Sequence, residues 1–199
     1  MQIDEIDPSG SNLAVLLKSL TEYEKKSFSR WTKENFGFFV WVESVGLHYS
    51  IKIESETDNQ EYNINDMGFG YSQVLPIIAS LWLEIFKRNK KGKYIIFVIE
   101  QPELHLHPEY QAKLSILFSR IVTIAKDKGL GLRIIFETHS KTMVDTLGDC
   151  IEDKIIEKDD VNIVLFQKES NQGTVISFSD FDEQGYLNHW PVGFFSGRL

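Results

Sequence analysis

Glu100, Gln101 and Glu103 are the residues of this chain most suited to chemistry. They follow an apolar run over residues 94–99 and open a turn, the acidic turn, that spans residues 100–108 and reads Glu-Gln-Pro-Glu-Leu-His-Leu-His-Pro. A buried strand that ends in a carboxylate is how nucleotide-binding α/β proteins hold Mg²⁺. We therefore expect Glu100 to ligate Mg²⁺, directly or through water. A Glu-x-x-Glu pair also suits a solvated turn, but the proline and the spaced histidines are not what such a turn requires.

A second apolar strand, predicted over residues 133–136, ends in Glu137-Thr138-His139-Ser140, the histidine loop. A histidine after a strand is often a capping or packing residue. Here, however, it is paired with the acidic turn, which ends the earlier apolar strand. That pairing favours a chemical role for His139.

Gly68, Gly70, Ser72 and Gln73 belong to a third segment, residues 68–73, called here the glycine loop. It precedes a segment of helical periodicity, so it reads as a turn that feeds a helix. Glycines, a serine and free backbone N–H groups at a helix start are also what an anion site needs. Both interpretations are open at this point.

Together these segments resemble three landmarks of ABC-type ATPases, in particular the overcoming-lysogeny-defect (OLD), RecF and SMC-like group. The acidic turn resembles Walker B with its D-loop, and the Thr-His-Ser run resembles the switch-histidine loop that reaches the γ-phosphate. The glycine loop takes the place of the signature loop, although it departs from the usual Leu-Ser-Gly-Gly-Gln. The resemblance implies ATP as substrate, Mg²⁺ as cofactor and, because a signature loop acts on ATP held by the opposite subunit, a dimer.

The resemblance also assigns residues. Glu100, Gln101, Glu103 and His139 fall at catalytic places, with Glu100 as the Mg²⁺ ligand, and Gly68, Gly70, Ser72 and Gln73 fall at nucleotide-binding places. Gln101 stands where most ABC ATPases carry a catalytic glutamate, and a neutral amide cannot act as a general base. Either Glu103 or Glu137 therefore compensates, or hydrolysis is slow.

No Gly-x-x-x-x-Gly-Lys-Ser/Thr phosphate loop occurs in the 199 residues. The expected fold class is thus the C-terminal portion of a three-layer α/β, P-loop-NTPase-like domain. We expect that portion to span residues 1–178 and a short aromatic module, with Trp-Pro-Val-Gly-Phe-Phe at 190–195, to span residues 179–199. A missing Walker A lobe would complete it, in cis or in trans.

The group implies a role in phage defence or DNA maintenance beside a nuclease or another effector. Two alternatives are open: a catalytically inactive ATPase-like interaction module, and a regulatory partner whose glycine loop completes a site on another ATPase. A net charge of −8 gives DNA binding no support from the chain as a whole. One cysteine, no signal-peptide pattern and no membrane-length apolar run predict a cytoplasmic protein. Zinc at His105 and His107 is disfavoured, since no further ligands stand at suitable spacing.

Periodicity and turn residues predict the elements. We expect a helix over 12–31 with a break near Thr21, and a small antiparallel β element from strands at 38–42, 47–53 and 62–64. A helix over 72–88 would carry Pro76 in its first turn. Strand 94–99, apolar throughout, is expected to be covered on both faces. A helix over 108–128, a strand at 133–136, a short helix after Ser140 and a hairpin of 161–167 with 174–178 complete a parallel α/β layer.

Overall fold

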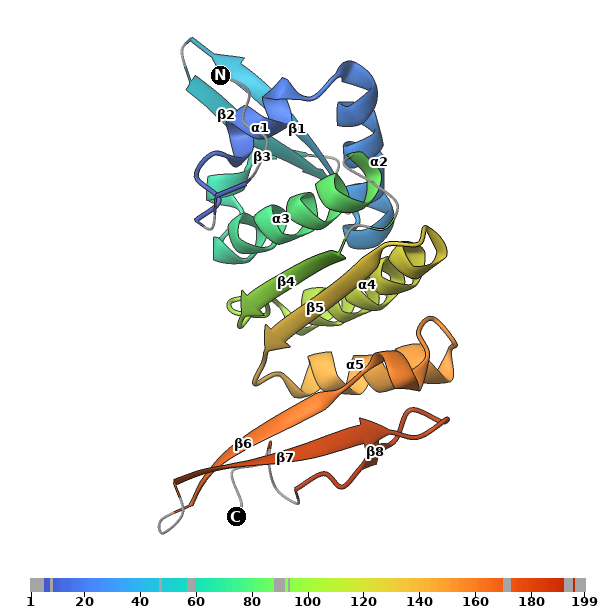
Figure 1. Cartoon of the computed structure of the whole chain (residues 1–199). Coiled ribbons are helices and arrows are strands. Elements are labelled where there is room, and N and C mark those ends of the chain that lie inside the picture. Colours follow the sequence, from blue (N-terminus) through green and yellow to red (C-terminus); the bar gives the residue numbers. More distant parts are fainter. Residues whose placement is uncertain are drawn as a thin grey trace.

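The computed structural model describes residues 6–7, 9–46, 48–56, 60–87, 92, 94–169, 173–191 and 195. Its elements follow one another through the molecule in chain order, from a small N-terminal sheet to a C-terminal hairpin (Figure 1). This is a mixed α/β fold with a small antiparallel sheet near the N-terminus, as predicted.

Two helices open the fold, α1 (Leu13–Ser19) and α2 (Glu22–Phe36). The predicted break at Thr21 is confirmed. Thr21 caps α2: its hydroxyl accepts a hydrogen bond from the backbone N–H of Glu24, and the Glu24 carboxylate accepts one from the N–H of Thr21. This reciprocal capping box satisfies two N–H groups that a helix start leaves unpaired.

Strands β1 (Phe38–Val45), β2 (His48–Ser55) and β3 (Glu61–Asn63) form the antiparallel sheet in the order β1-β2-β3. A short 3₁₀ turn, η1 (Ile64–Asp66), then leads to the glycine loop. The predicted β element is thus confirmed. Strands β1 and β2 end later than predicted, and β3 is shifted by one residue.

Helix α3 spans Phe69–Trp82 and continues into a π-helical turn, η2 (Leu83–Lys87). It begins three residues before the predicted start, so the placement of Pro76 in the first turn is wrong: this residue lies inside the helix. A proline there removes one backbone hydrogen bond. The proline ring packs closely on the N-terminal turn, where a Cβ on Gly10 would come within 2.7 Å of Pro76 Cγ.

Strands β4 (Tyr94–Glu100) and β5 (Gly131–Glu137) pair in parallel, and α4 (Pro108–Asp127) crosses between them. The expectation that β4 is covered on both faces is wrong. Alternate residues point to opposite faces of a strand, and the face formed by every second residue from Tyr94 is open. Val98 is 72% exposed and its register partner Ile135 is 56% exposed.

Helix α5 (Lys141–Glu152) and a 3₁₀ turn, η3 (Lys158–Asp160), lead to β6 (Ile163–Glu169) and β7 (Gly173–Phe181). These strands form the predicted antiparallel pair, while residues 170–172 of their connection lie outside the described part. The expectation of a third strand in the parallel layer is wrong, because β6 pairs with β7 and not with β5. In Figure 1, α5 lies between β5 and β6.

The chain then forms β8 (Leu187–Asn188), which pairs with the end of β7. Trp190 stacks on Phe195, with ring centroids 5.3 Å apart, and both pack on the apolar side of α5. Of the predicted aromatic module, residues 192–194 lie outside the described residues. The predicted boundary after residue 178 falls inside β7.

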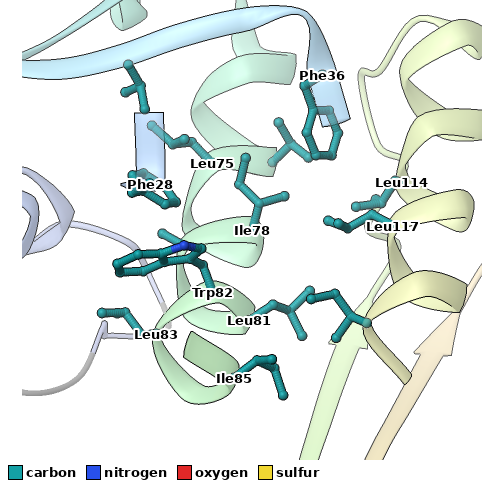
Figure 2. Close-up of a cluster of buried hydrophobic side chains, with 14 of the residues drawn as sticks. Phe28, Phe36, Leu75, Ile78, Leu81, Trp82, Leu83, Ile85, Leu114 and Leu117 are labelled. Carbon is teal, nitrogen blue, oxygen red and sulfur yellow. The ribbon is translucent and has the colours of Figure 1, made fainter. Parts of the chain in front are cut away.

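A single large core joins the N-terminal elements to α3, α4 and the inner face of β4 and β5. Figure 2 shows its centre, where α3 presents Ile78 and Leu81 toward Leu114 and Leu117 of α4, and Leu75 toward Phe28 of α2. This packing fixes α3 relative to α2 and α4. Within the described ranges, no helix combines the length and the apolar character needed to cross a membrane.

Candidate functional site

The site lies where β4 and β5 end. Glu100 and Glu137 are register partners on these adjacent parallel strands, so their Cα atoms are roughly 4.8 Å apart. Both side chains are exposed, and both belong to the open face that carries Val98 and Ile135. Two carboxylates thus stand side by side at the end of an apolar surface.

His139 joins this edge. Its Nε2 lies 3.7 Å from Glu137 Oε1, and the two side chains are 70% and 64% exposed. This is an ion pair only when the imidazole is protonated. The structure therefore places His139 beside Glu137, which is the register partner of Glu100.

Gln101, the second residue of the acidic turn, has a strained backbone conformation. Its φ of 43° lies in the left-handed region, and its backbone N–H donates to the carbonyl oxygen of Glu137 at 3.0 Å. That bond extends the β4–β5 ladder by one residue before the chain turns. The turn also needs a second left-handed residue, His105, with φ of 60°.

Glu103 differs from its neighbours because it is buried, at 9% exposure. Its Oε1 accepts a hydrogen bond of 2.9 Å from the backbone N–H of His139. Its Oε2 exposes less than 1 Å² and has no hydrogen-bond partner among the described residues. Glu103 thus reaches the histidine loop from inside the protein.

A second connection holds the base of the histidine loop. The Ser140 hydroxyl donates to Gln111 Oε1 at 2.5 Å and also accepts from the N–H of Met143, which caps α5. Gln111 Nε2 in turn donates to the carbonyl oxygen of Leu106 at 2.9 Å. The sequence analysis did not identify Gln111; its one signal was a polar side chain in the second turn of an otherwise amphipathic helix.

The start of α3 packs on the acidic turn of the same chain. A Cβ on Gly70 would lie 3.0 Å from the carbonyl oxygen of His105 and 3.1 Å from Leu106 Cδ2. Next to it, the hydroxyls of Tyr71 and Tyr110 are 2.7 Å apart. Burial, together with this hydrogen bond, raises the pKa of Tyr71 well above its usual value. Gly70 is therefore required by close packing within the chain.

The other residues of the glycine loop point elsewhere. Gly68 is the N-cap of α3 with φ of 84°, and no atom lies within 4 Å of where its Cβ would be. Ser72 lines a hollow of about 330 Å³ beside Gly10 and Tyr49, and Gln73 is exposed. Two residues along a helix differ by about 200°, so Gly70 and Ser72 occupy nearly opposite sides.

His107, the second histidine of the acidic turn, has a structural role. His107 is the N-cap of α4, and its Nδ1 accepts from the backbone N–H of Glu109 at 3.3 Å. Pro108 follows at the first helical position, where its missing N–H costs nothing.

The donor set at this edge fits Mg²⁺. The ion prefers oxygen ligands and is usually held by one or two carboxylates together with phosphate oxygens and water. Glu100 and Glu137 are the two exposed carboxylates that could hold it. Within the described ranges, no group of three or more His, Cys, Asp or Glu side chains is arranged as a metal site.

Comparison with known proteins gives the family and the fold of this chain. Residues 7–144 match the family described as AAA ATPase domain. No curated protein sequence matches the chain. Among solved structures the chain is similar to one from work on "Structural biochemistry of ATP-driven dimerization and DNA stimulated activation of SMC ATPases", with a TM-score of 0.50 and 11% identity, over 82% of this chain and 88% of that one. At this identity the likeness shows the fold.

The family match covers more than half of the chain, and it contains the glycine loop, the acidic turn and the histidine loop. On that ground the protein belongs to the AAA ATPase domain family, whose members are ATPase-like nucleotide-binding domains.

Proposed function

We propose that this chain supplies the Walker B, switch-histidine and signature-loop part of an ABC-type ATPase of the OLD-like group, which hydrolyses ATP with Mg²⁺ when a Walker A lobe completes it. The observation that supports this most is the meeting of Glu100, Glu137 and His139 at one sheet edge, with the start of α3 packed against the same turn.

In this proposal Glu100 organises Mg²⁺, which when bound neutralises charge on the β- and γ-phosphates. His139 donates toward the γ-phosphate, where negative charge accumulates during transfer. Glu137, 3.7 Å from His139, orients the imidazole or accepts a proton from the attacking water, as a general base in place of Gln101.

The open apolar face of β4 and β5 supports completion by another lobe. Isolated apolar side chains on a surface are ordinary, but contiguous apolar patches mark interaction sites. On β4 and β5 the apolar patch extends along both strands as far as Glu100 and Glu137. A Walker A lobe lying on Val98 and Ile135 would bring its phosphate loop to Glu100.

The exposed part of the glycine loop supports a dimer. Gly68 and Gln73 are exposed at the N-terminus of α3, where Gly68 makes no side-chain cap hydrogen bond. The N-terminus of a helix suits an anion. In the proposed homodimer they contact ATP held by the partner. The SMC ATPase work on ATP-driven dimerization concerns a similar fold. Phage defence or DNA maintenance, with a nuclease or other effector, is the proposed setting.

The decisive experiment mixes two inactive variants of the completed domain, Glu100→Gln and Gln73→Glu. The second places a carboxylate at the exposed start of α3 and avoids Gly70, whose side of the helix is occupied by the acidic turn. In a mixed dimer one composite site carries both changes and the other carries neither, so ATPase activity should return. Mixed dimers that form without recovering activity would contradict a trans-acting glycine loop.

Gln101 supports a second candidate function, a catalytically inactive ATPase-like module or a regulatory partner. The amide at this position cannot take a proton from water. This module would bind nucleotide and partner through the same surface without turnover. Single-turnover measurement separates the two: binding of ATP with no phosphate release, even with a Walker A lobe present, would favour the inactive module.

A further inference from the structure

Glu103 connects two segments that the sequence separates by more than thirty residues. A buried carboxylate is costly unless it is hydrogen-bonded, and the partner of Glu103 is the backbone N–H of His139, at 2.9 Å. The bond is to the main chain, so it constrains where the backbone of His139 lies.

We propose that Glu103 is a positioning residue, which fixes His139 relative to Glu100 and links the histidine loop to the start of α3 through the acidic turn. A general base must reach the attacking water. Glu103 Oε2, with less than 1 Å² exposed, is enclosed by protein, whereas Glu137 at the same edge is exposed.

The link to α3 depends on Gly70. Its Cα approaches the acidic turn so closely that a methyl group there would press on the carbonyl oxygen of His105. His105 lies two residues beyond Glu103, and the N–H of Leu106 donates to the Glu103 carbonyl oxygen at 3.0 Å. A displacement of the start of α3 would therefore move Glu103, and with it the backbone of His139.

The consequence rests on the proposed function. If the glycine loop meets ATP on the partner subunit, the acidic turn transmits that contact to the switch histidine of its own subunit. The two composite sites of the dimer would then be coupled through Glu103. The second connection, from Ser140 through Gln111 to Leu106, holds the base of the histidine loop and keeps α5 in place when Glu103 is changed.

The test is amide hydrogen exchange at His139, measured by NMR on the 199-residue chain without nucleotide. In Glu103→Ala the His139 amide should exchange roughly tenfold to a hundredfold faster, the range for loss of a hydrogen bond to a charged acceptor. Glu103→Gln keeps an oxygen acceptor and should retain most of the protection. Glu109→Ala, which removes an exposed carboxylate from the first turn of α4, is the matched control and should change nothing.

Gly70→Ala tests the link to α3. It should speed exchange at His139 in the otherwise unchanged chain, and should add little in the Glu103→Ala background, because the direct bond from the acidic turn to the His139 N–H is already gone and the remaining connection through Gln111 ends at Ser140. In the completed ATPase, Glu103→Ala should lower kcat roughly tenfold or more with little change in the KM for ATP, and Glu103→Gln should restore most of it.

Three results would overturn the proposal. They are an unchanged His139 amide in Glu103→Ala, equal damage from Glu103→Gln and Glu103→Ala, and additive effects of Gly70→Ala and Glu103→Ala. The exchange measurement needs no ATP hydrolysis. If the exchange results hold while the completed domain shows no turnover, the proposed function fails and the positioning role of Glu103 stands.

Discussion

At the scale of single residues, the carboxylates of the site differ in their surroundings. Glu100 and Glu137 face solvent beside an apolar surface, while Glu103 is enclosed and bonded to the main chain. An exposed carboxylate can exchange its water for a metal ion at little cost in desolvation. An enclosed carboxylate is out of reach of a metal ion from solvent, so its role is limited to its existing hydrogen bonds. The proposed metal ligand, Glu100, and the proposed positioning residue, Glu103, are thus distinguished by burial although only two residues separate them in the sequence.

His139→Ala should spare ATP binding and lower turnover of the completed domain by ~10²-fold or more, the scale seen when a donor to the transition state is lost. Steady-state ATPase assays with a parallel nucleotide-binding titration would measure both. His48→Ala, an exposed histidine on β2, is the control. Equal losses in binding and turnover would argue against a transition-state role.

Gln101→Glu should raise turnover by ~10²-fold if lack of a base limits the reaction, since a positioned general base contributes about that much or more. The change preserves side-chain shape at a residue whose backbone is already in the left-handed region. Stopped-flow phosphate release is the measurement. An unchanged rate would mean that Glu137 already serves as the base, and Glu137→Gln should then abolish activity.

The sequence predicted that Glu100 and His139 follow strands, because each apolar run is broken by polar residues where its strand ends. The sequence could not predict that Glu103 is buried while Glu100 is exposed. That difference depends on how the acidic turn folds, with left-handed residues at Gln101 and His105. The role of Gly70 was equally hidden, because its neighbour is a carbonyl more than thirty residues away.

At the scale of elements, two glycines let the C-terminal segment dock on α5. A Cβ on Gly148 would lie 2.3 Å from the carbonyl oxygen of Gly185, and a Cβ on Gly185 would lie 2.1 Å from that of Gly148. No side chain fits between these backbones. The turn between β7 and β8 is therefore held against the middle of α5, beside the small core that includes Cys150 and Phe181.

Gly148→Ala should destabilise the chain by about 1–3 kcal/mol, the usual cost of forcing extra atoms into a packed contact. This outweighs the ~0.5–1 kcal/mol that alanine gains over glycine inside a helix. Urea unfolding followed by circular dichroism gives the difference. Asp149→Ala, at the next and exposed position of α5, should stay within about 0.5 kcal/mol. A more stable Gly148→Ala variant would refute the close docking.

Local patterns predicted α4, α5 and the β6–β7 pair closely, because capping residues and apolar periodicity act within one element. They misplaced Pro76, since α3 begins before the predicted start and the contact of Pro76 with the distant turn at Gly10 is invisible to a local pattern. They also placed β6 in the parallel layer. Pairing partners depend on the whole sheet, which an order of elements along the chain does not specify.

At the scale of the molecule, apolar side chains remain exposed on two sheets. On β4 and β5 they are Tyr94, Ile96, Val98 and Ile135, and on β6 and β7 they are Val164, Phe166, Ile176 and Phe178. Within the second set, Val164 is directly opposite Phe178, and Phe166 is opposite Ile176. Surfaces of this kind favour association, with another lobe or with a second copy.

Val98→Lys combined with Ile135→Lys should reduce self-association of the chain and abolish its response to a Walker A lobe, because charges would replace the apolar surface beside the carboxylates. Sedimentation velocity over a range of concentrations measures the first effect, and ATPase activity measures the second. Tyr49→Lys, on the exposed part of β2, is the control. Unchanged association and full activity in the double variant would remove the basis for lobe docking on this face.

Cys150 is the one cysteine of the sequence, is 2% exposed, and has a thiol pKa that burial raises. Since the thiolate is the reactive form, the native thiol should be inert toward maleimides in the folded chain. The unmodified protein is therefore ready for site-directed labelling. A cysteine introduced at Gln73 would take a spin label or a fluorophore selectively. In the proposed dimer of the completed domain, the distance between two such labels would report directly how the starts of the two α3 helices approach each other when ATP is added.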